Sequence, residues 1–177
     1  MSRNRVLHVE QFIPRPLEEV FAFFSDAGNL ERITPPWLRF SIQSAQPVEM
    51  RVGTLIDYKL RVHGLPLRWR SRISAWAPPR RFVDEQVRGP YRVWIHEHRF
   101  EEVPGGVRVT DHVEYRAPGG PLEPVIHALL VRPDVQRIFA YRRRALAEIF
   151  GAGPAAESAP ADGVAGGRRG TATGSAA

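Results

Sequence analysis

Two alternating runs joined by a Pro-Gly-Gly turn occupy residues 92–116 (RVWIHEHRFEEVPGGVRVTDHVEYR) and restrict the fold more than any other stretch. In a β-strand, side chains two residues apart face the same side. One face of the first strand therefore carries Trp94, His96, His98 and Phe100, and one face of the second carries Val107, Val109, Asp111, Val113 and Tyr115. If both faces lie inside one curved sheet, two histidines and an aspartate sit on an otherwise apolar wall. Such a wall is typical of a small-molecule pocket.

Strand patterns continue on both sides of this hairpin, and helical periodicity is absent between residues 37 and 117. Strands are predicted at 4–14, 37–46, 53–63, 66–77, 81–88, 92–103 and 107–117. Glycine and proline mark the breaks between them, as expected for turns. Because the links are short, the strands should form an antiparallel meander.

Helices are predicted at three places. Residues 17–26 follow Pro16 and place apolar side chains on one face, and a second short helix covers 29–33 with Asp26 as its cap. Residues 121–150 carry an apolar stripe that Pro133 interrupts, which leaves two helices or one bent helix as alternatives.

Together these elements predict an α+β fold. A curved seven-stranded antiparallel sheet would wrap around the long C-terminal helix, with two short helices between the first two strands. Residues 1–150 would form this domain. Residues 151–177 are rich in Gly, Ala, Ser and Pro and are predicted to be a disordered tail.

Composition excludes several classes of protein. The 177-residue chain has no cysteine, so it has neither disulfides nor thiolate chemistry. It has no apolar run of ~20 residues and no recognisable signal peptide, so we expect a cytoplasmic protein. The net charge is +6 but no nucleic-acid-binding motif accompanies it, so no nucleic-acid partner is expected. The run 142–144, all arginine, should cover the solvent side of the last helix, with transient membrane-surface contact as the alternative. The oligomeric state is not predicted.

Six stretches resemble one protein superfamily. They are FAFFSD (21–26), NLERITPPW (29–37), GTLIDY (53–58), WRSRISAWAPP (69–79), FVDEQVRGPY (82–91) and WIHEHRF (94–100). The chain resembles the START/SRPBCC superfamily from residue 4 to about residue 150, and within it the bacterial polyketide cyclase/dehydrase and lipid transport group. The resemblance implies the helix-grip fold shared with the birch pollen allergen. It also implies binding of lipids, sterols, polyketides, quinones or hormones, with cyclase or hydrolase activity in some members.

Ten residues are predicted to contact a ligand. The apolar wall would consist of Trp69, Trp94, Phe100, Tyr115, Ile138 and Phe139, and the polar end of the ligand would meet Ser71, His96, His98 and Asp111. Loops at 64–66, 89–91 and 118–121 should lie together at the mouth. Which of Asp84, Glu85 and Gln86 faces inward stays open.

The histidine pair allows four interpretations. His96 and His98 could bind the ligand, belong to a buried structural network, act as general acid or base with Asp111 as the orienting group, or chelate a metal. No further metal ligand is evident beyond Asp111, so no metal or other cofactor is predicted.

Three functions follow from these observations. The first is a carrier or sensor that binds a hydrophobic small molecule (lipid, quinone or polyketide-like) without catalysis. The second is a cyclase or dehydratase of a polyketide-like substrate with a histidine base. The third is an accessory interaction protein, such as a quinone-binding chaperone.

Overall fold

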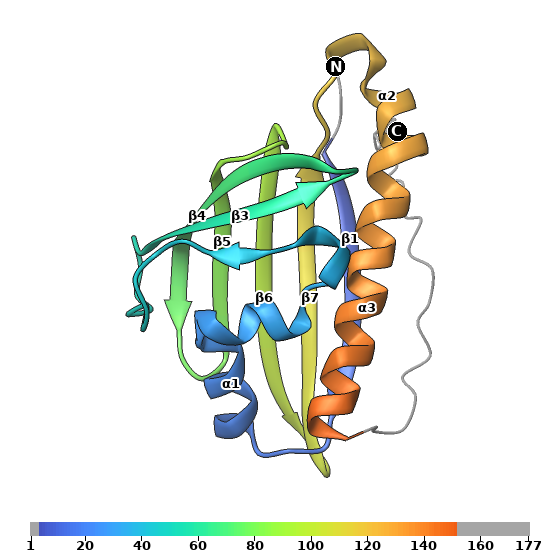
Figure 1. Cartoon of the computed structure of the whole chain (residues 1–177). Coiled ribbons are helices and arrows are strands. Elements are labelled where there is room, and N and C mark those ends of the chain that lie inside the picture. Colours follow the sequence, from blue (N-terminus) through green and yellow to red (C-terminus); the bar gives the residue numbers. More distant parts are fainter. Residues whose placement is uncertain (1–3, 152–177) are drawn as a thin grey trace, which may run out of the picture.

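A curved antiparallel sheet wraps around one long C-terminal helix, as predicted (Figure 1). The computed structural model describes residues 4–151. The sheet order is β1-β7-β6-β5-β4-β3-β2. The strands are β1 (Arg5–Ile13), β2 (Ser41–Ile42), β3 (Leu55–Val62), β4 (Leu65–Ala77), β5 (Arg81–Arg88), β6 (Val93–Val103) and β7 (Gly106–Arg116). The predicted disordered tail lies outside the described residues, except for Gly151.

The strand predicted at 37–46 is the main error in the predicted elements. Only Ser41–Ile42 forms a strand there. The preceding residues form the short 3-10 helix η2 (Pro36–Leu38), and Arg39 follows in the left-handed conformation with φ 42°. Proline at the start of a helical turn loses no hydrogen bond, because an N–H at that position has no partner within the helix. The two prolines at 35 and 36 therefore favour a turn over the extended run that the alternation suggested.

The β6–β7 hairpin has the register that the alternation requires. His98 pairs with Asp111, and Trp94 pairs with Tyr115. The turn needs its glycines. Gly105 has φ 86°, and a Cβ atom on Gly106 would lie 2.2 Å from the backbone oxygen of Ile13. Trp94 of β6 and Tyr115 of β7 belong to the same apolar cluster as Phe139 of the C-terminal helix, so the predicted inner faces of both strands are those that face the helix.

A short helix fills one end of the curved sheet. Helix α1 (Leu17–Ser25) buries Phe21 and Phe24 against Phe100 of β6, with ring centroids 5.3 and 5.2 Å apart. The 3-10 helix η1 (Ala27–Ile33) follows, and the backbone N–H of Gly28 donates to the Asp26 carboxylate at 2.9 Å, the predicted cap. This packing closes the end of the sheet beside the C-terminal half of the long helix (Figure 1).

The C-terminal helix is one continuous run with a widened turn in the middle. It comprises η3 (Gly120–Leu122), α2 (Glu123–Ile126), the π-helical turn η4 (His127–Val131) and α3 (Arg132–Phe150). Pro133 lies in the first turn of α3, directly after the π-helical turn. The wider turn accommodates the proline, which lacks an N–H and would clash in a regular helix. Within residues 4–151 no helix has both the length and the apolar character needed to cross a bilayer.

Candidate functional site

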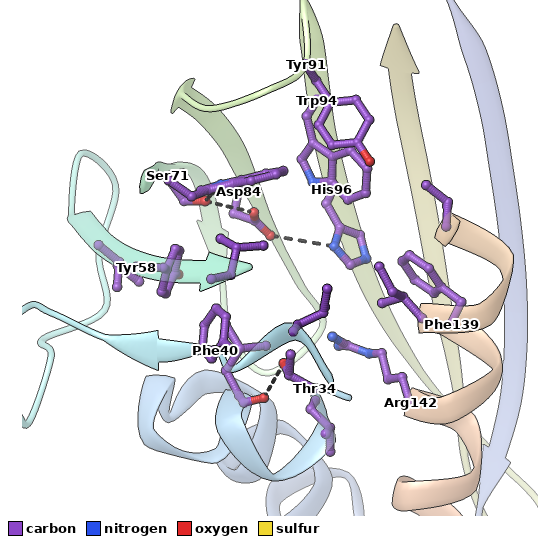
Figure 2. A pocket seen from close by; sticks show the side chains of 18 of the residues that line it. Thr34, Phe40, Tyr58, Ser71, Asp84, Tyr91, Trp94, His96, Phe139 and Arg142 are labelled. Carbon is purple, nitrogen blue, oxygen red and sulfur yellow. Dashed lines mark hydrogen bonds and ion pairs between the residues drawn. The ribbon is translucent and has the colours of Figure 1, made fainter. Parts of the chain in front are cut away.

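The sheet and α3 enclose a cavity of about 360 Å³ (Figure 2). Its volume lies within the range of small-molecule sites, ~300–1,000 Å³. Most of its wall is apolar. The aromatic part of the lining comprises Phe23, Phe24, Phe40, Tyr58, Trp69, Phe82, Tyr91, Trp94 and Phe139.

Seven of the ten predicted ligand-contact residues line this cavity. They are Trp69, Ser71, Trp94, His96, His98, Ile138 and Phe139. Their position agrees with the predicted inner faces of β4 and β6 and with the apolar stripe of the helix. Ligand contact by these residues remains a prediction.

The other three predicted residues, Phe100, Asp111 and Tyr115, do not line the cavity. Phe100 is only 2% exposed because α1 occupies the space in front of it. Asp111 lies behind the two histidines, and Tyr115 is covered by the C-terminal helix through a 2.9 Å hydrogen bond to His127. Strand alternation placed them on the correct face, but elements distant in sequence cover them.

Two histidines and two aspartates form a buried cluster at the cavity wall. Nε2 of His96 donates to Oδ1 of Asp111 at 2.9 Å, and Nε2 of His98 donates to Oδ2 of Asp84 at 3.2 Å. The remaining ring nitrogens also face carboxylates. Nδ1 of His98 lies 2.9 Å from Oδ1 of Asp111 without hydrogen-bond alignment, and Nδ1 of His96 lies 3.8 Å from Oδ2 of Asp84. Asp84 is thus the inward-facing acid of residues 84–86 that the sequence left open.

The carboxylates of the cluster and its cationic side chains stabilise each other's charged forms. Burial by itself disfavours every charged form. For Asp111 this is outweighed by the charge of Arg142 and by the histidines, which keep the pKa of Asp111 well below its usual value. Burial opposes protonation of His98, yet the Asp111 and Asp84 carboxylates raise the pKa of His98. Burial and the neighbouring His98 lower the pKa of His96. His98 therefore takes up a proton more readily than His96 does.

Arg142 corrects the prediction that residues 142–144 cover the solvent side of the helix. Arg143 and Arg144 are exposed, but Arg142 is only 9% exposed and lines the cavity (Figure 2). Its Nε lies 3.7 Å from Oδ2 of Asp111, and its guanidinium carbon lies 5.3 Å from the centre of the Phe24 ring. The signal was present in the sequence, because Arg142 falls on the same helical stripe as Phe139 and Leu146.

A second polar group lies on β3 and β4. Nε1 of Trp69 donates to Oγ of Ser71 at 3.0 Å, and this hydroxyl donates to Asp84 at 3.4 Å. Tyr58 lines the cavity beside them, and burial raises the pKa of its hydroxyl, so that it stays protonated. These bonds fix the indole ring of Trp69 at the wall.

Three donor atoms of the cluster are spaced as metal ligands can be. One atom each from Asp84, His96 and His98 lies within 4.8 Å of the others, and these residue types bind transition metals. Asp84 already accepts a hydrogen bond from His98, and the positive charge of Arg142 belongs to the same cluster. Because that charge opposes a further cation, we assign no metal here.

Two of the three loops predicted to form the mouth contribute to the cavity. Pro90, Tyr91 and Pro118 of these loops line it. In the third loop Leu65 is 68% exposed, and the preceding residue that lines the cavity is His63. Figure 1 shows this end of β3 and β4 beside the start of α3.

Comparisons with known proteins agree with the fold and with the resemblance. A family model described as "Polyketide cyclase / dehydrase and lipid transport" matches residues 5–150. Protein CV1439 from Chromobacterium violaceum is 14% identical, with a TM-score of 0.65 over 84% of this chain and 98% of that one. Ginseng major latex-like protein 151 from Panax ginseng is 11% identical, with a TM-score of 0.61 over 83% and 97%.

A third solved structure is longer than this chain. The nucleoside-diphosphate sugar epimerase from Corynebacterium glutamicum is 28% identical with a TM-score of 0.58, over 80% of this chain but only 28% of that one. No curated protein matches the chain. The comparisons therefore confirm the superfamily and the helix-grip fold predicted from the sequence.

Proposed function

Because the chain belongs to the polyketide cyclase / dehydrase and lipid transport family, we propose that it binds a hydrophobic small molecule in its internal cavity, as a carrier or sensor without catalysis. The ligand would have an apolar body and one polar end. The observation that carries the proposal is the cavity itself: about 360 Å³, largely apolar, with polar groups converging at one wall.

The histidine geometry supports binding over catalysis. A general base needs a free lone pair within hydrogen-bond reach of its substrate. Both ring nitrogens of His96 and of His98 face carboxylate oxygens, at 2.9 to 3.8 Å. Each Nε2 is committed to a hydrogen bond, and each Nδ1, although it makes none, lies beside a carboxylate oxygen.

One observation favours the cyclase or dehydratase alternative. The hydrogen bond from His96 to Asp111 resembles a base held by its orienting carboxylate. His96→Ala separates the two functions. A cyclase would lose turnover but keep substrate affinity, whereas a carrier would lose affinity.

The proposal is tested with N-phenylnaphthylamine, an uncharged fluorescent probe that brightens in apolar surroundings. We expect saturable one-to-one binding to the wild type. Ile138→Trp fills the cavity and should weaken binding at least about ten-fold, a loss equivalent to ~1.4 kcal/mol. Leu129→Trp is the matched control, because Leu129 is 70% exposed and does not line the cavity. Equal binding by both variants would reject the internal site.

A further inference from the structure

Arg142 reaches the inner end of the cavity, and the N–H groups of its guanidinium have no hydrogen-bond acceptor in the described part of the chain. The side chain is 10% exposed, and Figure 2 shows its guanidinium directed toward the cavity from α3. Among residues 4–151 nothing accepts a hydrogen bond from its guanidinium: Nε is shielded and lies 3.7 Å from Oδ2 of Asp111, which leaves the Nη groups as the donors that face the cavity. A buried donor without a partner is costly, and arginine offers only donors. The group that completes this site must therefore bring an acceptor.

The surrounding charges define what kind of acceptor fits. Asp84 and Asp111 carry two negative charges, Arg142 carries one positive charge, and His98, whose pKa the two carboxylates raise, supplies a second when it is protonated. The cluster is then balanced before any ligand enters. A ligand carboxylate would add a third buried negative charge beside two others, which is unfavourable because like charges in a buried site repel.

We infer that Arg142 donates hydrogen bonds to an uncharged oxygen acceptor of the ligand, a carbonyl group such as that of a ketone, quinone or ester. The inference rests on the proposed function, because it names the polar end of the same ligand. Arg142 is then the residue that selects a carbonyl over both a hydrocarbon and an acid.

The position of Arg142 along the helix also orients the ligand. Val131 and Arg142 both line the cavity, and they are eleven helical steps apart, about 16.5 Å at 1.5 Å per residue, with Val131 on the side of the predicted mouth loop 118–121. The carbonyl would therefore lie innermost. The apolar body would extend past Phe139 and Trp94 toward Tyr91 and Pro118 at the predicted mouth.

Three probes of nearly equal shape test this selection. Methyl naphthyl ketone, isopropylnaphthalene and naphthoate differ only in whether the group on the ring is a carbonyl, a hydrocarbon or a carboxylate. Their affinities are measured by isothermal titration calorimetry and by quenching of tryptophan fluorescence, since Trp69 and Trp94 line the cavity. We expect the wild type to bind the ketone about ten-fold more tightly than the hydrocarbon, as expected of a hydrogen bond to a charged donor. It should bind naphthoate more weakly than the ketone.

Two variants assign the selectivity to Arg142. Arg142→Met should bind isopropylnaphthalene as the wild type does but lose the ketone preference. Arg143→Met removes an exposed neighbouring arginine and should retain it. If Arg142→Met does not fold, infrared spectroscopy of the wild type replaces it. The carbonyl stretching frequency of the bound ketone should lie below its value in hexane.

The outcomes separate this inference from the proposed function. Equal affinities for ketone and hydrocarbon in the wild type, or an unshifted carbonyl frequency, would overturn the role of Arg142 and leave hydrophobic binding intact. Preference for naphthoate would overturn the uncharged class. Failure of all three probes to bind would overturn the proposed function, and this inference with it.

Discussion

The imidazole of His63 and the carboxylate of Asp134 meet at 2.7 Å and join the turn after β3 to the first turn of α3. His63 and Gly64 form a two-residue hairpin turn with φ values of 50° and 81°, a geometry that matches the twist of the flanking strands. Both members of the pair line the cavity, and the His63 side chain is 55% exposed. The pair is therefore a contact at the rim of the cavity, between the sheet and the helix.

Removal of this contact should speed ligand exchange more than it affects stability. In His63→Ala, dissociation of N-phenylnaphthylamine should be up to about five-fold faster, since exposed ion pairs contribute ~0–1 kcal/mol. The free energy of unfolding should change by no more than ~1 kcal/mol. Stopped-flow fluorescence measures the rate. His8→Ala, which removes an exposed imidazole on β1, is the control. An unchanged dissociation rate would show that the pair does not restrict the mouth.

Asp111→Asn should be the most destabilising single change in the cluster. Asp111 is the carboxylate that His96, His98 and Arg142 share, at 2.9, 2.9 and 3.7 Å. Its loss leaves Asp84 as the one carboxylate of the cluster that compensates the buried cationic groups, at a cost of about 3–5 kcal/mol. Urea unfolding measures the loss. Glu101→Gln breaks the exposed pair with Arg108 and should cost ~0–1 kcal/mol. Comparable losses in the two variants would refute the central role of Asp111.

Tyr115→Phe should loosen the helical segment that contains the π-helical turn. The hydroxyl of Tyr115 and Nε2 of His127 share a buried 2.9 Å hydrogen bond. Without it, His127 keeps an unsatisfied buried nitrogen, at a cost of about 1–3 kcal/mol. Hydrogen exchange at residues 123–131 should accelerate. Tyr141→Phe is the control, because no described residue forms a hydrogen bond with that hydroxyl. If exchange accelerates equally across α3, the effect is global and the local interpretation fails.

Stability should fall on the alkaline side of neutrality because of His98. The folded protein raises the pKa of His98 above its unfolded value of 6.5. Its stabilising contribution is therefore complete below pH 6.5 and is lost as the pH rises through the folded pKa. The free energy of unfolding, measured by urea titration from about pH 6 to pH 9, should decline in the wild type.

Variants test the source of this decline. His98→Gln should flatten it, although the variant is less stable overall, whereas His8→Gln should reproduce the wild-type slope. His96 and His127 do not account for such a decline, because burial lowers the pKa of each and their contributions are lost toward acid instead. A wild-type slope that His98→Gln leaves unchanged would mean that another group titrates.

The alternation of β6 and β7 shows how far the sequence alone could go. A period of two depends only on neighbours along the chain, so the inner faces of both strands were predictable. The short links between the strands likewise predicted the antiparallel meander. The same alternation gave a wrong prediction at 37–46. There the prolines favour a short 3-10 helix, and the strand is limited to Ser41–Ile42.

The tertiary structure alone decided which inward-facing side chains reach the cavity. Phe100 and His98 share one strand face, but α1 covers Phe100 and leaves His98 at the cavity wall. Asp84 and Arg142 joined the cluster because β5 brings Asp84 beside the two histidines and α3 brings Arg142 beside Asp111. The sequence by itself determined the strands, the faces and the helix stripe, since these arise from short-range periodicity. The volume of the cavity and the charge balance of the histidine–aspartate cluster arise from contacts between side chains far apart in sequence. Only tertiary packing could therefore decide them.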